Sequence, residues 1–183
     1  MGNGKWENSA RASPPTPHYP LPTMYPTPAF EAKICPPEEL RQRIAALPRP
    51  LVFTNGCFDI LHRGHVTYLG QARALGAAMV VALNSDASVR RQGKGDDRPI
   101  NTLADRLAVM AALGCVDLVT WFDEDTPLKA ILACQPDVLV KGGDWAPERI
   151  VGAPETLARG GSVHSIPFEH LRSTTALLEK IRR

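Results

Sequence analysis

The stretch 54–65 constrains the fold of this 183-residue chain more than any other, and its sequence is TNGCFDILHRGH. It follows the apolar run 51–53, which is typical of a short buried strand, and it precedes a segment with helical spacing of apolar residues at 66–75. Where a strand leads through a turn into a helix, the first backbone N–H groups of the helix are unpaired. These groups and the helix dipole both favour the binding of phosphate. His62 and His65 are three residues apart and therefore share one face of the first helical turn. The stretch predicts a site that holds a polyphosphate while two imidazoles act on it.

Strand and helix patterns alternate along the rest of the chain. Buried-strand patterns cover residues 51–53, 78–83, 116–122, 138–140 and 162–166, and helical patterns cover residues 37–46, 66–75, 102–113, 126–134 and 173–181. In the segment 102–113 the apolar positions share one face and Arg106 lies near the other. This alternation predicts an α/β fold with a doubly wound parallel sheet, whose ligands bind outside the carboxyl ends of the strands.

The N-terminal residues 1–32 form a proline-rich arm in our interpretation, and residues 33–183 form the folded domain. Residues 1–30 hold seven prolines and few aliphatic side chains. Because proline removes an N–H donor and fixes φ, this segment neither pairs as a central strand nor continues a helix. We expect residues 1–30 to add little to the fold, either as a disordered segment or as one draped over a neighbouring subunit. Trp6, Tyr19 and Tyr25 keep the second possibility open.

A second segment without an element pattern is 90–98, which is rich in glycine and charge. Such composition is typical of a mobile loop. The loop is either a solvated connector or a cover over a nucleotide site, and the sequence favours neither.

Composition excludes several classes of function. The formal net charge of +2 implies no broad basic surface for nucleic acid. No apolar run approaches the roughly 20 residues that cross a bilayer, and the first thirty residues lack the apolar core of a signal peptide. The four cysteines are scattered without a CxxC pair, which favours reduced thiols over a zinc site or a disulfide framework. We therefore expect a cytoplasmic protein without a membrane or nucleic-acid partner.

Two further motifs add polar groups at element ends. Residues 172–175 read RSTT, and the hydroxyls and free N–H groups at a helix start make a second phosphate-binding corner, although a plain N-cap by Ser173 is the alternative. Lys141 ends a predicted strand and is followed by two glycines, so its ammonium can be offered to a substrate phosphate. The alternative there is a surface lysine in an ordinary turn.

The motifs taken together resemble a known superfamily. The pattern 56–59, GCFD, followed by His62, Gly64 and His65, resembles the HxGH signature of the cytidylyltransferases and adenylyltransferases, and residues 172–175 match the (I/R)S(S/T)T motif of the same superfamily. The resemblance implies a Rossmann-like nucleotidyltransferase (HUP-type) fold. It also implies attack of a phosphate on the α-phosphorus of a nucleoside triphosphate, with pyrophosphate as the leaving group.

The resemblance also implies roles for individual residues. His62 and His65 are expected to bind the α- and β-phosphate oxygens, where charge builds in the reaction, and Lys141 is expected to meet the acceptor. No side-chain nucleophile is needed, so Cys57 is interpreted as a small residue packed in the turn, while Asp59 either holds the turn or contacts the ligand. The expected nucleotide-binding residues are Asn55, Gly56, Cys57, Phe58, Asp59, Gly64, Arg98, Gly142, Arg172, Ser173, Thr174 and Thr175.

Four blocks, at 84–91, 98–101, 122–127 and 138–144, narrow the resemblance. Together they are similar to the family of adenylyltransferases that make ADP-heptose from D-glycero-β-D-manno-heptose 1-phosphate for bacterial lipopolysaccharide core, over roughly residues 38–183. The family implies ATP and a sugar 1-phosphate as substrates. Because the triphosphate carries several negative charges, we also expect Mg²⁺, carried by ATP and held mainly by phosphate oxygens and water, with no metal site of the protein's own. It often has tyrosine where this chain has Trp145, which leaves base or sugar contacts at that position in doubt.

The same family resemblance suggests partners. In many members this domain is fused behind a sugar kinase, and no kinase-like segment precedes it here. We therefore expect a stand-alone form, served by a separate heptose kinase upstream, and we expect a homo-oligomer.

Three competing functions are disfavoured by the sequence. A cytidylyltransferase acting on glycerol 3-phosphate or ethanolamine phosphate shares the HxGH and Ser-Thr-Thr motifs, but Lys141 and the acidic residues 123–125 favour the heptose substrate. A module that binds ATP without turnover conflicts with the intact His62, His65 and Ser173. A dinucleotide-dependent oxidoreductase lacks its motif, because no G-x-G-x-x-G follows a predicted strand.

Overall fold

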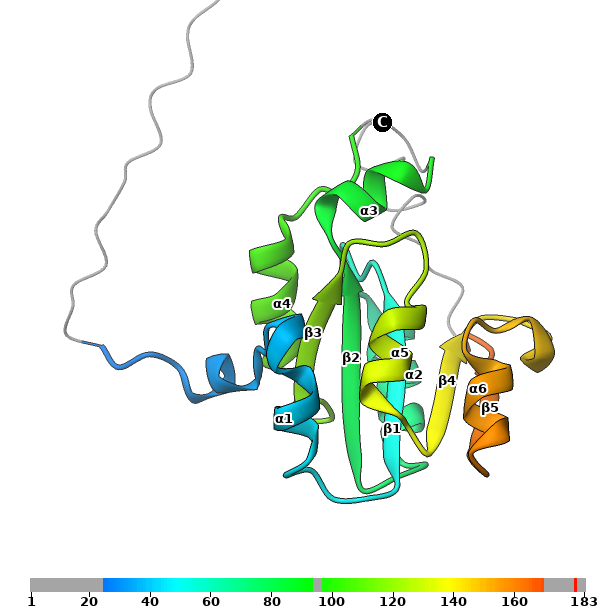
Figure 1. Ribbon diagram of the computed structural model, residues 1–183. Helices are drawn as coiled ribbons and strands as arrows, with labels where there is room; N and C mark the ends of the chain where they lie inside the picture. Colours follow the sequence, from blue (N-terminus) through cyan, green and yellow to red (C-terminus); the bar gives the residue numbers. More distant parts are fainter. Residues whose placement is uncertain (1–24, 94–96, 170–179, 181–183) are drawn as a thin grey trace, which may run out of the picture.

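A single parallel sheet forms the centre of the protein, as seen in a computed structural model that describes residues 25–93, 97–169 and Lys180 (Figure 1). Its five strands are arranged in the order β3-β2-β1-β4-β5. The strands are β1 Leu51–Gly56, β2 Ala78–Asn84, β3 Leu118–Phe122, β4 Val138–Gly142 and β5 Ser162–Ile166. The doubly wound α/β fold predicted from the sequence is therefore confirmed, with all five strands at the expected places.

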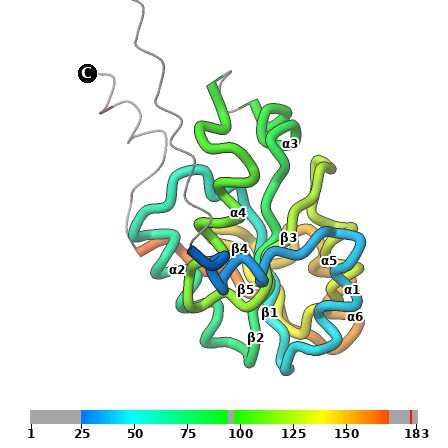
Figure 2. The backbone as a smooth tube through the Cα atoms, turned by 90° about the vertical axis from the view of Figure 1, so that its left-hand side faces the viewer, coloured from blue at the N-terminus to red at the C-terminus, as the bar shows by residue number. Residues whose placement is uncertain are grey.

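Helices cover both faces of the sheet (Figure 2). One face carries α2 Arg63–Arg73 and α4 Leu103–Ala111, and the other carries α1 Leu40–Ile44, α5 Leu128–Cys134 and α6 Ala153–Ala158. The short α3, Asp86–Arg91, follows β2 at the carboxyl edge. Three 3₁₀ turns complete the described elements: η1 Ala29–Lys33, η2 Pro37–Glu39 and η3 Pro147–Arg149. The sequence did not predict η1, α3, η3 or α6, and the helix expected at 173–181 lies outside the described residues apart from Lys180.

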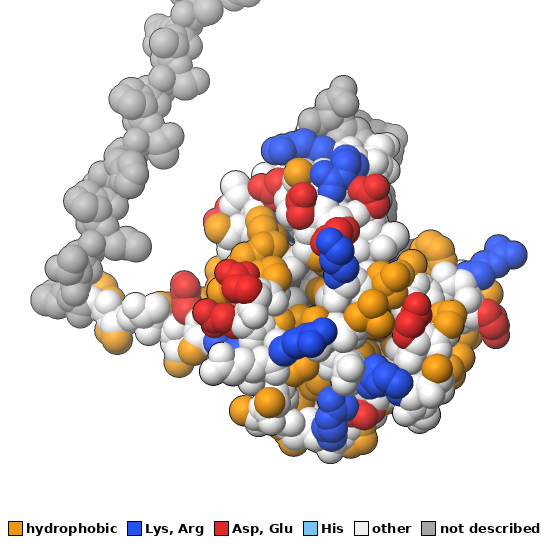
Figure 3. Space-filling view, in the orientation of Figure 1, with side chains coloured by type: hydrophobic (Ala, Val, Ile, Leu, Met, Phe, Trp, Pro, Cys, Tyr) orange, Lys and Arg blue, Asp and Glu red, His pale blue; other side chains and the backbone are white. Residues whose placement is uncertain are grey.

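The central strands are buried on both faces, which explains their continuous apolar runs. Along β1, Leu51 and Phe53 pack in the core beneath α1, α5 and α6, while Val52 packs in the core beneath α2 and α4. All three side chains are at most 1% exposed. Outside this core, positive and negative side chains are interspersed on the face that carries α1, α5 and α6, as the small net charge leads one to expect (Figure 3).

The two edges of the sheet are built differently. At the amino edge, two aspartate carboxylates bind the strands. Asp117 and Asp137 precede β3 and β4, and each accepts hydrogen bonds from a strand N–H and from an arginine. The donors are Met79 (2.8 Å) and Arg73 (3.0 Å) for Asp117, and Leu51 (2.6 Å) and Arg49 (2.6 Å) for Asp137. These contacts tie neighbouring strands together at that end.

The carboxyl edge splits between β1 and β4. β1 pairs with β2 over its whole length, from Leu51↔Ala78 to Gly56↔Leu83, but it pairs with β4 only at Val52↔Val138 and Phe53↔Leu139. The split falls at the point where the strand order reverses, which is the usual ligand site of such sheets.

Tyr68 of α2 fills the base of this split. Its hydroxyl forms a hydrogen bond with the Thr54 hydroxyl of β1 and donates to the Val140 carbonyl of β4 at 3.4 Å. Tyr68 is 2% exposed, and burial raises the pKa of its hydroxyl well above the ordinary value. The hydroxyl therefore remains a neutral bridge between the two strands.

Two expectations about charged segments are corrected by the structure. Arg106 was expected near the outer face of the helix at 102–113, but it is only 2% exposed, because backbone and carboxylate oxygens surround its guanidinium. The segment 90–98 is not one loop, because its first two residues end α3 and Arg98 is buried, while residues 94–96 lie outside the described residues.

Two features of composition can also be compared with the structure. All four cysteines are free, as their spacing predicts. No helix in the described part of the chain is both long and apolar enough to cross a membrane.

The proposed N-terminal arm falls only partly within the described residues, since residues 1–24 lie outside them. Within η1, Phe30 packs against the core beneath α2 and α4, and the Lys33 ammonium donates to the Leu113 carbonyl at 3.2 Å. Ile34 forms a parallel bridge with Val119 of β3. The chain is thus attached to the domain from about residue 29 onward, and the boundary at residues 32 and 33 stays a prediction.

Two N-terminal deletions should separate the arm from the packed turn. Removing residues 1–28 should change the thermal midpoint by no more than about 3 °C, whereas removing residues 1–33 should lower it by about 5 °C or more, because the Phe30 packing is lost. Thermal unfolding at fixed protein concentration measures both. A large drop after the shorter deletion, together with dissociation on a sizing column, would contradict this and identify the arm as an intersubunit element.

Candidate active site

The split between β1 and β4 opens into a cleft of about 630 Å³. Its walls come from the ends of β1, β2 and β4, the first turns of α2, and the residues around η3. Of the predicted site residues, the following line it: Asn55, Gly56, Cys57, Phe58, His65, Lys141 and Gly142. The structure therefore brings together most of the predicted residues that it describes, from three separate segments of the chain.

The first turn of α2 presents both histidines of the HxGH motif. His62 is the N-cap residue and His65 lies one turn into the helix, with their rings stacked at a centroid distance of 3.8 Å and an interplanar angle of 23°. No described side chain caps this helix, whereas Ser85 caps α3 and Thr102 caps α4. Because the His65 N–H already donates to the His62 carbonyl at 2.9 Å, the N–H groups that this helix start offers to an anionic ligand are those of Arg63 and Gly64.

His65 is held in its neutral form. Burial, and to a lesser extent the neighbouring His62, lower the pKa of His65 from 6.5 to about 4. The Ile60 backbone has a smaller, opposite effect on this pKa. The buried Nδ1 atom of His65 has no hydrogen-bond partner among the described residues. At neutral pH the imidazole can therefore donate a hydrogen bond to a phosphate oxygen without carrying a charge of its own.

Aromatic side chains fix the His65 ring. Phe58 contacts it edge-on at 5.3 Å between ring centroids, and Phe168 does so at 6.0 Å. Phe58 adopts a left-handed backbone conformation with φ 45°, which is costly for a bulky residue. At Gly56 a Cβ atom would lie 2.9 Å from the Phe58 ring, so any larger residue there would displace it.

Lys141 and Asn55 lie across the split from each other. The Lys141 ammonium donates to the Asn55 side-chain oxygen at 3.3 Å and to its carbonyl at 3.4 Å. Behind the lysine, a Cβ atom at Gly142 would lie 2.8 Å from the Phe168 ring and 3.1 Å from the Tyr68 ring. The half-buried cation therefore lies in the cleft wall, with a glycine required beside it.

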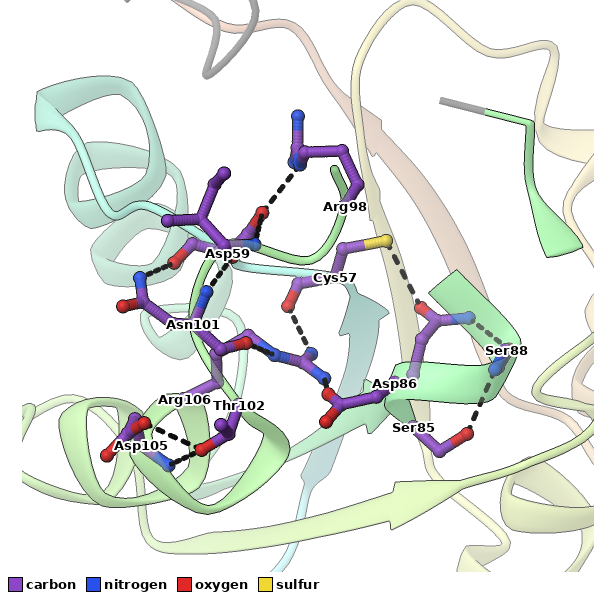
Figure 4. A network of polar contacts seen from close by, with 12 residues as sticks. Cys57, Asp59, Ser85, Asp86, Ser88, Arg98, Asn101, Thr102, Asp105 and Arg106 are labelled. Carbon is purple, nitrogen blue, oxygen red and sulfur yellow. Dashed lines mark hydrogen bonds and ion pairs between the residues drawn. The ribbon is translucent and has the colours of Figure 1, made fainter. Parts of the chain in front are cut away.

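Asp59 is placed to hold the turn rather than to line the cleft. It is 3% exposed, and its carboxylate accepts from Arg98 Nε at 2.6 Å, from the Ile100 N–H at 2.9 Å and from the Asn101 N–H at 2.9 Å (Figure 4). Arg98 forms an ion pair with this carboxylate and does not line the cleft. His62 and Gly64 are also outside the cleft lining, so the ligand contacts expected of these four residues stay predictions.

Several cleft residues were not predicted. Tyr68 lies three residues after His65, so helical spacing alone could have placed it on the same face. Arg149 adds a second cation to the lining beside Lys141, and Phe168 supplies an aromatic wall. Arg149 lies in η3 and Phe168 lies two residues after β5, so neither falls within a periodic pattern that could have marked it. Trp145, noted only as a departure from the family, also lines the cleft and is 51% exposed.

The second predicted phosphate corner, Arg172, Ser173, Thr174 and Thr175, lies outside the described residues. In the part of the chain that the structure describes, no group of three or more His, Cys, Asp or Glu side chains is arranged to hold a metal ion.

Comparison with known proteins gives two kinds of match in sequence. Residues 53–158 match the model of the cytidylyltransferase-like family. The chain is 58% identical over 156 residues to a D-beta-D-heptose 1-phosphate adenylyltransferase from Bordetella bronchiseptica, covering 84% of this chain and 96% of that protein. It is 56% identical over 130 residues to the bifunctional protein HldE from a Marinomonas species, of whose length it spans 27%.

Solved structures are similar as well. A lipopolysaccharide core biosynthesis protein from Thermoplasma volcanium superposes with a TM-score of 0.54 at 29% identity, covering 67% of this chain and 98% of that one. A pantoate-beta-alanine ligase from Francisella tularensis superposes with a TM-score of 0.52 at 13% identity, covering 78% of this chain and 68% of that one. The second similarity shows the fold alone.

The state of His65 can be tested in the free protein. We expect its imidazole to titrate near pH 4 by NMR, and to titrate at higher pH once inorganic triphosphate fills the cleft, because a nearby anion favours the charged form. Since the bound form then holds the proton more tightly, triphosphate affinity should increase as the pH falls toward 4. The signal is assigned by its loss in His65→Gln. An ordinary pKa near 6.5 in the free protein would contradict the buried, neutral imidazole.

Proposed function

The chain belongs to the cytidylyltransferase-like family of nucleotidyltransferases, and we propose that it transfers AMP from ATP to D-glycero-β-D-manno-heptose 1-phosphate. The products are ADP-heptose, for lipopolysaccharide core, and pyrophosphate. The observation that carries this proposal is the match to the Bordetella adenylyltransferase, which extends over 96% of that protein's length at 58% identity. The cleft at the split of β1 and β4 is where the reaction would take place.

In the proposed reaction, an oxygen of the sugar phosphate attacks the α-phosphorus of ATP. The bond from this phosphorus to the oxygen that bridges to the β-phosphate breaks, and pyrophosphate leaves with the electron pair. Such a transfer depends on positioning and on stabilising the developing charge, so it requires no side-chain nucleophile. The His65 imidazole supports this reading, because it lines the cleft at the start of α2 as a neutral hydrogen-bond donor.

The two histidines and the lysine have separate proposed roles. His65 donates to the phosphate oxygens that gain charge, while His62 stacks on His65 and begins the helix whose N-terminus faces the triphosphate. Lys141 brings a positive charge to the opposite wall of the split, where the acceptor phosphate would lie. Arg172 to Thr175 would bind the triphosphate from the other side.

The finer expectations about partners remain part of the proposal. Mg²⁺ would enter with ATP, held by phosphate oxygens and water, because the triphosphate carries several negative charges and this ion gives up water reluctantly. ATP is a cytoplasmic nucleotide, so we place the reaction in the cytoplasm. A heptose kinase must supply the sugar 1-phosphate, and a homo-oligomer is expected.

The substrate assignment is tested by a two-by-two competition. ATP or CTP is combined with heptose 1-phosphate or glycerol 3-phosphate, and pyrophosphate release is measured for each pair. We expect ATP with heptose 1-phosphate to give the highest kcat/KM. The best turnover with CTP and glycerol 3-phosphate would replace the assignment with a cytidylyltransferase, and ATP binding without any pyrophosphate release would identify a non-catalytic module.

The role of Lys141 is tested by Lys141→Met. We expect kcat/KM for heptose 1-phosphate to fall about 100-fold or more, on the order of 3 kcal/mol, because the acceptor oxygens lose a charged donor. ATP binding without the sugar should change much less. Lys129→Met is the matched control, because Lys129 is 79% exposed on α5 and pairs with Glu124. Equal rates for the two variants would remove Lys141 from the acceptor site.

A further inference from the structure

Arg106 is a buried arginine whose guanidinium joins three segments at the carboxyl edge of the sheet. It donates from Nε to the Asn101 carbonyl at 3.1 Å and from its two terminal nitrogens to the Cys57 carbonyl and the Asp86 carboxylate, both at 2.7 Å. Its side chain is 1% exposed, and that of Asp86 is 30% exposed. The loop after β1, the start of α3 and the start of α4 are therefore tied to one cation (Figure 4).

Asp59 makes a second attachment on the same loop. Its carboxylate is bound by Arg98 and by two backbone N–H groups of the segment 98–101, and its carbonyl accepts from the Asn101 side chain at 2.6 Å. The Asn101 carbonyl thus accepts one hydrogen bond from Arg106, and its side-chain amide donates one to the Asp59 carbonyl. The two attachments form one continuous network.

Phe58 lies between the two attached residues. It is the residue with φ 45° whose ring contacts His65, and it is 7% exposed. A bulky residue keeps such a conformation only where its surroundings impose it. Here the Cys57 carbonyl is fixed on one side by Arg106 and Asp59 is fixed on the other, so the backbone at Phe58 has little freedom to relax.

We propose that Arg106 is a positioning residue for the transfer reaction, which together with Asp59 clamps the backbone on both sides of Phe58 and thereby holds the His65 imidazole in the cleft. Arg106 does not line the cleft and would touch neither substrate. Its effect passes through the Cys57 carbonyl to the Phe58 ring and from there to His65. The inference rests on the proposed function, because it assumes that His65 acts on the phosphates.

The test compares Arg106→Met with Arg73→Met. Arg73 makes the same set of contacts at the amino edge of the sheet, although its side chain is 31% exposed. It pairs with Asp117 at 3.0 Å and donates to the carbonyls of Gly76 and Ala77 at 2.6 and 2.5 Å. Each substitution removes one ion pair and two hydrogen bonds to carbonyls. Both variants are assayed by pyrophosphate release at a temperature where thermal unfolding shows them folded.

We expect Arg106→Met to lower kcat about 100-fold or more, with KM for the sugar phosphate within about threefold, since a displacement of about 1 Å in a reacting group costs that much. Arg73→Met should keep kcat within about threefold of the wild type. NMR supplies a second measure that needs no activity. The pKa of His65 should rise from about 4 toward its ordinary value in Arg106→Met and stay unchanged in Arg73→Met.

A folded Arg106→Met variant with the kcat and His65 titration of Arg73→Met would overturn the clamp. Where Arg106→Met does not fold, Asp86→Asn decides, because it weakens one arm of the guanidinium contact and keeps the arginine. A tenfold loss of kcat with an altered His65 titration supports the clamp, and an unchanged enzyme refutes it. The rates are measured with whichever nucleotide and acceptor the wild type uses best, so that failure of the heptose assignment does not decide this test.

Discussion

The early end of pairing between β1 and β4 is the feature on which the site depends. The two strands share only Val52↔Val138 and Phe53↔Leu139, although both continue toward the carboxyl edge. The Tyr68 hydroxyl replaces the missing ladder contacts by joining the two strands at the base of the split. Above it, the Lys141 ammonium spans the split to Asn55 in place of ladder hydrogen bonds, and both residues line the cleft. A fully paired sheet would have no cleft here.

The same chemistry stabilises the two edges of the sheet with different consequences. At the amino edge, Asp117 binds Arg73 and a strand N–H, and the contact serves only to join strands. At the carboxyl edge, Asp59 and Arg106 bind loop backbone instead, so their contacts determine where a loop lies. Burying these charges is tolerated because each is paired and hydrogen-bonded, whereas an unpaired one would cost several kcal/mol. The ion pairs near the cleft therefore fix the position of the loop after β1 as well as contributing to the stability of the fold.

The sequence predicted the features that have a local signature. Five apolar runs gave the five strands, and the HxGH spacing placed His62 and His65 on one helical turn. Arg106 was misplaced because amphipathic spacing assigns a polar side chain to the outer face. Two of its three acceptors come from residues 49 and 20 positions earlier in the chain. The cleft lining from Arg149 and Phe168 was missed for the same reason, since only the fold brings these irregular segments to β1 and β4. The long-range contacts that set the site have no local pattern.

The neutrality of His65 bears on how the proposed reaction would be accelerated. A permanently charged group binds the triphosphate before reaction as well as during it, and such uniform binding does not raise kcat. An imidazole that burial keeps neutral in the free protein responds differently, because its hydrogen bond strengthens as negative charge grows on the phosphate oxygens. The aromatic rings of Phe58 and Phe168, which bury the imidazole, therefore do more than fix its position. By suppressing its charge at rest, they reserve the larger part of its interaction for the transition state.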